Sequence, residues 1–142
     1  MTTHIIGIGT EIVECVRVAR MIERHDERFL RRVFTTREIE YCSSRRFATQ
    51  AYACCWAAKE AVLRAMATRW QKEIDYRDIE IRFDPQGGRT GVAFAGGVRE
   101  VCERYSIGDI LVTTAHCRTH ATAYAIAMAR DPDESEIQDD DF

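Results

Sequence analysis

Hydrophobic and polar positions follow two different periods along the chain, and these periods predict which segments are strands and which are helices. Near the N-terminus, residues 4–10 alternate as in a strand, with Ile6 and Ile8 on one face and Gly7 and Gly9 on the other. Glycines inside a strand indicate close approach by another group. That group could be a ligand or the backbone of a packed helix, and the sequence favours neither.

A period of 3.6 residues follows and predicts helices. The first covers residues 13–24 and would turn a short apolar face to the core, made of Val13, Val16, Ala19 and Ile22. A second helical piece is expected over residues 29–34. Thr35-Thr36-Arg37-Glu38 matches a capping box, which predicts a short helix running toward Cys42. The longest helix is predicted over residues 48–68, where apolar side chains occupy almost the whole circumference.

Beyond this helix the period returns to two. Residues 79–83 and 92–94 alternate on either side of the turn Asp84-Pro85-Gln86-Gly87-Gly88, which predicts a hairpin. A helix should start after Gly96-Gly97, and two further strands are expected over residues 110–114 and 121–128. This order predicts an α+β fold in which an antiparallel sheet packs on the long buried helix.

Charge divides the chain into a body and a tail. All 20 basic residues lie at or before Arg130, whereas seven of the 23 acidic residues follow it. We therefore expect one domain over residues 1–130 and an acidic, disordered tail over residues 131–142. The body is mildly basic, which suits an acidic partner or a phosphate-bearing ligand better than a nucleic acid.

Several classes of protein are excluded by simple features. No run of about 18 apolar residues exists, so no membrane span is expected. The N-terminus lacks the regions of a signal peptide, which makes the cytoplasm the expected location. The six cysteines match no zinc-binding spacing, and in that compartment we expect reduced, structural thiols.

The long helix also contains charges where its pattern predicts burial. Lys59, Glu60 and Arg64 interrupt an otherwise apolar segment, and Lys59 is one of only two lysines in the chain. A buried carboxylate is costly unless a cation, a metal ion or hydrogen bonds compensate it. This segment is therefore a candidate site.

Two further polar residues could join it. Glu11 is expected at the end of the first strand, and His116 at the end of a late strand. Carboxylates bind Mg²⁺ and cations hold phosphate oxygens, so the set suits a magnesium–phosphate site. Taken singly, Glu60 with Arg64 could be an internal ion pair, and His116 could be a hydrogen-bonded core histidine.

Four separated motifs resemble those of the holo-acyl carrier protein synthases. They occur in that family's order over about residues 4–129: Gly7-Ile8-Gly9-Thr10-Glu11-Ile12-Val13-Glu14, Arg28-Phe29-Leu30-Arg31-Arg32-Val33-Phe34-Thr35, Trp56-Ala57-Ala58-Lys59-Glu60-Ala61 and Ala115-His116. The resemblance implies a 4′-phosphopantetheinyl transferase-like fold. It also implies transfer of the phosphopantetheine arm of coenzyme A to a serine of apo-acyl carrier protein, with release of adenosine 3′,5′-bisphosphate. Mg²⁺ would be the cofactor, and the enzyme would be a homotrimer with sites between its subunits.

The same resemblance implies roles for individual residues. Glu11 and Glu60 match the metal ligands, Lys59 and Arg64 match positions near the phosphates, and His116 matches a histidine beside the coenzyme. Thr68, at the end of the buried helix, and Arg69, directly after it, would belong to the coenzyme cleft. Lys59, Glu11 and Glu60 are the candidate catalytic residues. The proton of the carrier serine could pass to Glu60, to Glu11 or to a metal-bound water.

Three positions depart from the family's pattern. Glu11 stands where the family has Asp, Ala115 replaces a hydroxyl-bearing residue, and Arg69 replaces a glycine. Arg69 could reshape the cleft or contact the 3′-phosphate of the coenzyme. These departures raise an alternative: a binding module for coenzyme A or carrier protein whose turnover is reduced or lost.

A basic stripe offers a surface for the carrier protein. It recurs at spacings of three and four and consists of Arg17, Arg20, Arg24, Arg28 and Arg31. The resemblance implies that Arg17, Met21, Arg24 and Arg28 contact the acidic recognition helix of the carrier. The alternative is a solvated face whose charge is balanced by Glu23, Asp26 and Glu27.

Overall fold

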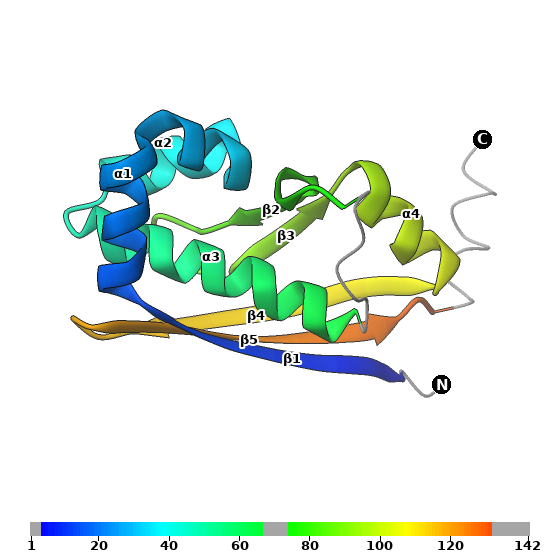
Figure 1. Cartoon of the computed structure of the whole chain (residues 1–142). Coiled ribbons are helices and arrows are strands. Elements are labelled where there is room, and N and C mark those ends of the chain that lie inside the picture. Colours follow the sequence, from blue (N-terminus) through cyan, green and yellow to red (C-terminus); the bar gives the residue numbers. More distant parts are fainter. Residues whose placement is uncertain (1–3, 67–73, 132–142) are drawn as a thin grey trace.

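The computed structural model describes residues 4–66 and 74–131 (Figure 1). Its elements in chain order are β1 (Ile5–Glu14), α1 (Cys15–Val33), α2 (Thr36–Ser44), α3 (Ala48–Ala65), the short 3₁₀ helix η1 (Tyr76–Asp78), β2 (Ile79–Arg82), β3 (Gly91–Phe94), α4 (Gly96–Arg104), β4 (Ile107–His116) and β5 (His120–Ala129). This is the predicted mixture of helices and antiparallel strands.

The strands form two antiparallel sheets. β5 lies between β1 and β4 in a three-stranded sheet, and β2 pairs with β3 in a separate hairpin. Figure 1 shows α3 lying along one face of the larger sheet, with the other helices and the hairpin on that same side. The opposite face of the sheet carries no other element of the described chain.

Gly7 and Gly9 allow α3 to lie directly on β1. A β-carbon at Gly7 would lie 2.1 Å from the carbonyl oxygen of Ala65, and one at Gly9 would lie 1.9 Å from that of Ala61. Real β-carbons do not approach backbone this closely, so only glycine fits. The two glycines therefore accommodate a packed helix, which is one of the two alternatives that the sequence left open.

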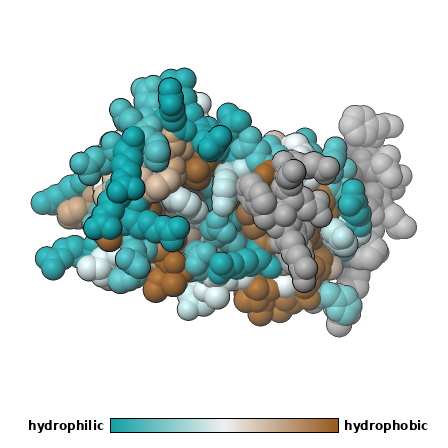
Figure 2. Space-filling view, viewed as in Figure 1, coloured by the Kyte–Doolittle hydropathy of each residue, from teal (hydrophilic) through white to brown (hydrophobic). Residues whose placement is uncertain are grey.

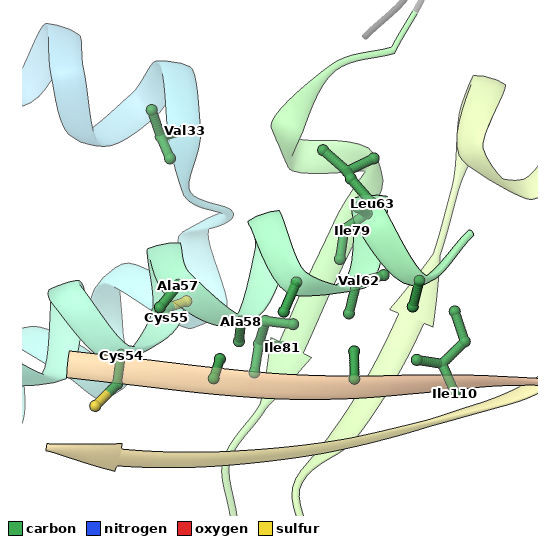
Figure 3. Close-up of a cluster of buried hydrophobic side chains, with 14 of the residues drawn as sticks. Val33, Cys54, Cys55, Ala57, Ala58, Val62, Leu63, Ile79, Ile81 and Ile110 are labelled. Carbon is green, nitrogen blue, oxygen red and sulfur yellow. The ribbon is translucent and has the colours of Figure 1, made fainter. Parts of the chain in front are cut away.

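Small side chains continue this close packing across β5. Every second residue of β5 from Ala121 to Ala127 is a buried alanine, and α3 contributes Ala57, Ala58 and Ala61. Figure 3 shows side chains from α3, β2 and β4 meeting in this core, among them Val62, Ile79 and Ile110. α3 is buried over most of its circumference, as its pattern predicts.

The cysteines are all free thiols, as expected. Five are buried and behave as small apolar residues: Cys15, Cys42, Cys54, Cys55 and Cys102. Cys117 is exposed beside His116. No helix of the described residues is long and apolar enough to cross a membrane.

The boundary between β1 and α1 differs from the prediction. β1 continues to Glu14 and α1 starts at Cys15, so Val13 belongs to the strand. Of the residues near the start of α1, Cys15 and Val18 are buried, whereas Val16, which was expected to face the core, is exposed. Asp26 has non-helical angles (φ 46°, ψ −125°) and kinks α1, in agreement with two predicted helical pieces.

Candidate active site

Glu11 and Glu60 line one small pocket, about 210 Å³ in volume, together with Arg17 and Trp56. The packing of α3 on β1 places them there. Glu11 lies two residues beyond Gly9 on the same face of β1, and Glu60 precedes Ala61, the residue whose backbone packs on Gly9. The close contact that glycine permits thus brings the two predicted carboxylates together.

Glu11 is held at both of its carboxylate oxygens. Oε2 lies 3.0 Å from Nη2 of Arg64, and Oε1 accepts a hydrogen bond from the backbone N–H of Ile12 (2.9 Å). Arg64 also donates to the carbonyl oxygen of Thr10 (2.7 Å). Arg64 therefore pairs with Glu11 of β1, and not with Glu60 one turn away as the internal ion-pair alternative required.

Glu60 is oriented by two hydrogen bonds to one oxygen. The hydroxyl of Tyr76 donates to Oε1 at 2.5 Å, and Nε1 of Trp56 donates to the same atom at 3.3 Å. Neither bond uses Oε2. The carboxylate is thus fixed in direction, and within residues 4–66 and 74–131 no hydrogen bond is made to its second oxygen.

Lys59 differs from its prediction. Its side chain is fully buried, and Nζ contacts Oε1 of Glu38 (2.7 Å) and the carbonyl oxygens of Tyr76 (2.9 Å) and Ile79 (2.5 Å). A lysine ammonium has three donors, and all three are used inside the protein. Lys59 therefore cannot contact a phosphate in this arrangement, and its charge compensates Glu38.

His116 lies in a different pocket, about 450 Å³ in volume, whose lining also includes Arg45, Arg46 and Cys54. Nδ1 of His116 is 3.6 Å from the sulfur of Cys54. Burial raises the pKa of Cys54 to about 11, so it remains a thiol. This pocket shares no lining residue with the pocket of Glu11 and Glu60. Within one chain, His116 is not brought to the carboxylates.

The sequence did not reveal several residues that contact the predicted site residues or line one of the pockets. Tyr76 carries no motif and reaches Glu60 only through the fold. The sequence predicts the role of Glu38 in capping α2, which the structure confirms. It does not predict that Glu38 pairs with Lys59. Arg45 and Arg46, an adjacent basic pair ahead of the long helix, could have been noticed. Thr68, Arg69 and residues 132–142 lie outside the described residues.

The donor set fits a magnesium ion that arrives with a phosphate. Mg²⁺ is usually held by one or two protein carboxylates, with water and substrate phosphates completing its shell. Glu11 and Glu60 supply two such ligands. Among residues 4–66 and 74–131, no group of three or more His, Cys, Asp or Glu could form a metal site by itself. The protein therefore offers a partial site that a ligand would complete.

The basic stripe lies on the exposed surface of α1. Arg17, Arg24 and Arg28 are exposed, whereas Met21 is half-buried. Of the five stripe arginines, all of them within the described residues, only Arg31 makes an ion pair, with Glu27 at 3.7 Å. Of the three balancing acids named in the alternative, only Glu27 forms an ion pair with a stripe arginine among the described residues. Arg17 also reaches the pocket of Glu11 and Glu60.

Residues 7–129 match the family model described as the 4′-phosphopantetheinyl transferase superfamily. The chain belongs to this superfamily. It is 40% identical over 122 residues to the holo-[acyl-carrier-protein] synthase of Rhodopirellula baltica, covering 86% of this chain and 96% of that protein. The motifs that carry the resemblance fall within the matched region, which confirms the family inferred from them.

Solved structures agree with the fold. The holo-[acyl-carrier-protein] synthase of Neisseria meningitidis is 24% identical with a TM-score of 0.79, and the match covers 87% of this chain and 98% of that one. A holo-(acyl-carrier-protein) synthase of Bacillus anthracis, in complex with coenzyme A (3′,5′-ADP), is 25% identical with a TM-score of 0.70. That match covers 88% of this chain and 97% of the Bacillus anthracis chain.

Proposed function

We propose that this protein is a holo-[acyl-carrier-protein] synthase, which transfers the 4′-phosphopantetheine arm of coenzyme A to a serine of apo-acyl carrier protein and releases adenosine 3′,5′-bisphosphate. The observation that carries this proposal is the pocket in which Glu11 and Glu60 meet beside Arg64 and Arg17. Carboxylates for a cation and guanidinium groups for phosphate oxygens are what phosphoryl transfer requires.

Glu11 and Glu60 would hold Mg²⁺. When bound, the ion would neutralise the pyrophosphate of coenzyme A and stabilise charge on its oxygens. The chain's own residues position the reacting groups. Arg64, whose side chain is 55% exposed, can reach a phosphate while its other contacts tie it to β1. In-line attack by the carrier serine then depends on orientation and electrostatics, with little covalent chemistry left to the protein.

The serine proton needs an acceptor in the same pocket. Glu60 has an oxygen that neither of its two hydrogen bonds uses, whereas both oxygens of Glu11 are engaged. Because that oxygen of Glu60 is also the one assigned to Mg²⁺, Glu60, Glu11 and a water beside the metal ion all stay candidates for the acceptor. Pairing with Arg64 would accommodate the longer side chain of Glu11, compared with the family's Asp.

The coenzyme would span two subunits of a homotrimer. Support comes from the separation of the two pockets, because His116, Arg45 and Arg46 would then hold one end of a coenzyme whose pyrophosphate lies at Glu11 and Glu60 of the neighbouring subunit. Large apolar side chains on the uncovered face of the sheet offer an assembly surface. Ile8 is 66% exposed and Ile12 is 64% exposed on β1, and Tyr124 is 55% exposed on β5.

The carrier protein would dock on α1. The stripe arginines are exposed, and Arg17 links this surface to the proposed reaction pocket. A carrier bound there would present its serine near Glu11 and Glu60. Such charge-based docking should weaken with added salt. A location in the cytoplasm, where a carrier would be met, stays a prediction.

The proposal is tested by incubating the full chain with coenzyme A, Mg²⁺ and an apo-acyl carrier protein, and measuring the intact mass of the carrier. A gain of one phosphopantetheine arm is expected. Binding of coenzyme A with no mass gain on several carriers would contradict transferase activity and favour the binding module raised by Glu11, Ala115 and Arg69.

A further inference from the structure

Tyr76 belongs to none of the motifs, yet its hydroxyl makes the shorter of the two hydrogen bonds to Glu60. We infer that Tyr76 is a positioning residue, which holds the Glu60 carboxylate in the direction that lets it share a metal ion with Glu11. The inference rests on the proposed function, since it assigns a role to Tyr76 within that same site.

The hydroxyl of Tyr76 is the donor in this contact. Its oxygen lies 2.5 Å from Oε1 of Glu60, a distance typical of a short O–H···O bond to a carboxylate. A phenol beside a carboxylate donates to it, because the ionised carboxylate can only accept.

Two donors select one oxygen of Glu60. Tyr76 and Trp56 both bond to Oε1, from η1 and from α3 respectively. A carboxylate held from two directions cannot rotate freely, and its Oε2 keeps a fixed orientation. Hydrogen bonds of this kind to a metal-binding carboxylate typically change metal affinity or activity by about 10–100-fold when they are removed.

The backbone of Tyr76 is itself anchored. Nζ of Lys59 donates to the carbonyl oxygen of Tyr76 at 2.9 Å and to that of Ile79 at 2.5 Å, while Oε1 of Glu38 lies 2.7 Å from the same nitrogen. Lys59 and Glu38 are fully buried or nearly so. η1 is thereby fixed to α3 by a hydrogen bond from Lys59, whose charge is paired with Glu38 of α2. Lys59 thus acts on the site through Tyr76, although it cannot contact a phosphate.

Tyr52 offers a matched comparison. It is a buried residue of α3, and its hydroxyl bonds to Oγ of Ser43 and to the carbonyl oxygen of Ile39. These partners lie away from the pocket of Glu11 and Glu60, whose lining does not include them. Removing either hydroxyl deletes one partly buried hydrogen-bonding group, but of the two only the hydroxyl of Tyr76 contacts a candidate metal ligand.

The test compares Tyr76→Phe with Tyr52→Phe in the full-length protein. Binding of Mn²⁺ in the presence of coenzyme A is titrated by electron paramagnetic resonance, and thermal unfolding is recorded for each variant. Tyr76→Phe should raise the Mn²⁺ dissociation constant by about tenfold or more. Tyr52→Phe should lower the melting temperature and leave Mn²⁺ binding within twofold of the unchanged protein.

Equal Mn²⁺ affinity in Tyr76→Phe and the unchanged protein would overturn the inference, as would failure of the unchanged protein to bind Mn²⁺. The transfer reaction is scored separately, by the mass of the carrier. An unchanged protein that binds Mn²⁺ but transfers nothing would contradict the proposed function, while the Mn²⁺ comparison would still decide the role of Tyr76.

Discussion

Lys59 and Glu60 are neighbours in sequence, yet their side chains contact different parts of the protein. Successive residues of a helix point about 100° apart, so Lys59 faces Glu38 and the carbonyls beside β2, whereas Glu60 lines the pocket with Glu11. Burial of an ammonium group is tolerated here because one carboxylate and two carbonyl oxygens receive its hydrogens. The charge of Lys59 therefore stabilises the fold, whereas the charge of Glu60 belongs to the candidate active site.

Lys59→Met should therefore destabilise the protein rather than remove a phosphate contact. The change leaves the carboxylate of Glu38 buried without its cation, which typically costs about 3–5 kcal/mol. Urea denaturation measures this loss. Adding Glu38→Gln should recover part of it, because a neutral amide can still cap α2. A free energy of unfolding for Lys59→Met within about 0.5 kcal/mol of that of the unchanged protein would contradict this role.

At the scale of elements, the contact between β1 and α3 determines the geometry of the site. Gly7 and Gly9 bring the backbone of α3 onto the strand, and the carboxylates of Glu11 and Glu60 lie next to this contact. The alanines of β5 extend the same close approach across the sheet. Spacing between these two elements is thus coupled to the spacing between the two candidate metal ligands.

Gly9→Ala should push α3 away from β1, because the new β-carbon would lie 1.9 Å from the carbonyl oxygen of Ala61. Overpacking of this kind costs about 1–3 kcal/mol and sometimes more, and backbone atoms cannot move aside as side chains do. Gly91→Ala is the control, since its β-carbon would meet only Cβ and the carbonyl oxygen of Arg82, at the ordinary contact distances of 3.8 and 4.0 Å. Equal stability of the two variants in chemical denaturation would refute the packing argument.

Much of this arrangement could be predicted from the sequence because periodicity, caps and turns are local signals. The capping box at Thr35 and Glu38 is present as predicted, and so are the hairpin and the buried helix. The end of β1 was harder to predict. In the structure β1 continues to Glu14, and Glu11 lies on the same inward face as Gly7 and Gly9. In the sequence, a polar residue at position 11 indicates the end of a strand.

The parts of the site that the sequence could not reveal depend on long-range contacts. Glu38 precedes Lys59 by 21 positions and Tyr76 follows Glu60 by 16, and no local pattern links either pair. A lysine beside a glutamate in a candidate site is naturally assigned to the ligand. Only the position of β2 and η1 against α3 shows that its ammonium points into the protein.

At the scale of the whole molecule, one face of the main sheet carries apolar side chains with no covering element among the described residues. Ile8, Ile12 and Tyr124 are each more than half exposed there. Figure 2 shows apolar groups along the lower edge of the view, below the strands of Figure 1. Exposed apolar surface of this kind usually marks an interface, which agrees with the proposed trimer.

Ile8→Lys should dissociate that trimer, because a charge at the centre of an apolar interface is left without a partner. Light scattering after size exclusion should give about three times the chain mass of 16.3 kDa for the unchanged protein and a smaller species for the variant. Tyr105→Lys is the control, since Tyr105 is 57% exposed but lies after α4. A monomeric unchanged protein, or an intact trimer in Ile8→Lys, would contradict the proposed assembly.

The central claim is that the pocket of Glu11 and Glu60 performs the transfer, and single-turnover transfer by Glu60→Gln tests it most directly. The reaction is followed by the mass of the carrier, with Glu80→Gln as the control, because Glu80 pairs with Arg82 on β2 outside the pocket. We expect the rate to fall by about 100-fold or more in Glu60→Gln, with unfolding unchanged, and to stay close to normal in Glu80→Gln. A folded Glu60→Gln variant that transfers the arm at the unchanged rate would contradict the claim.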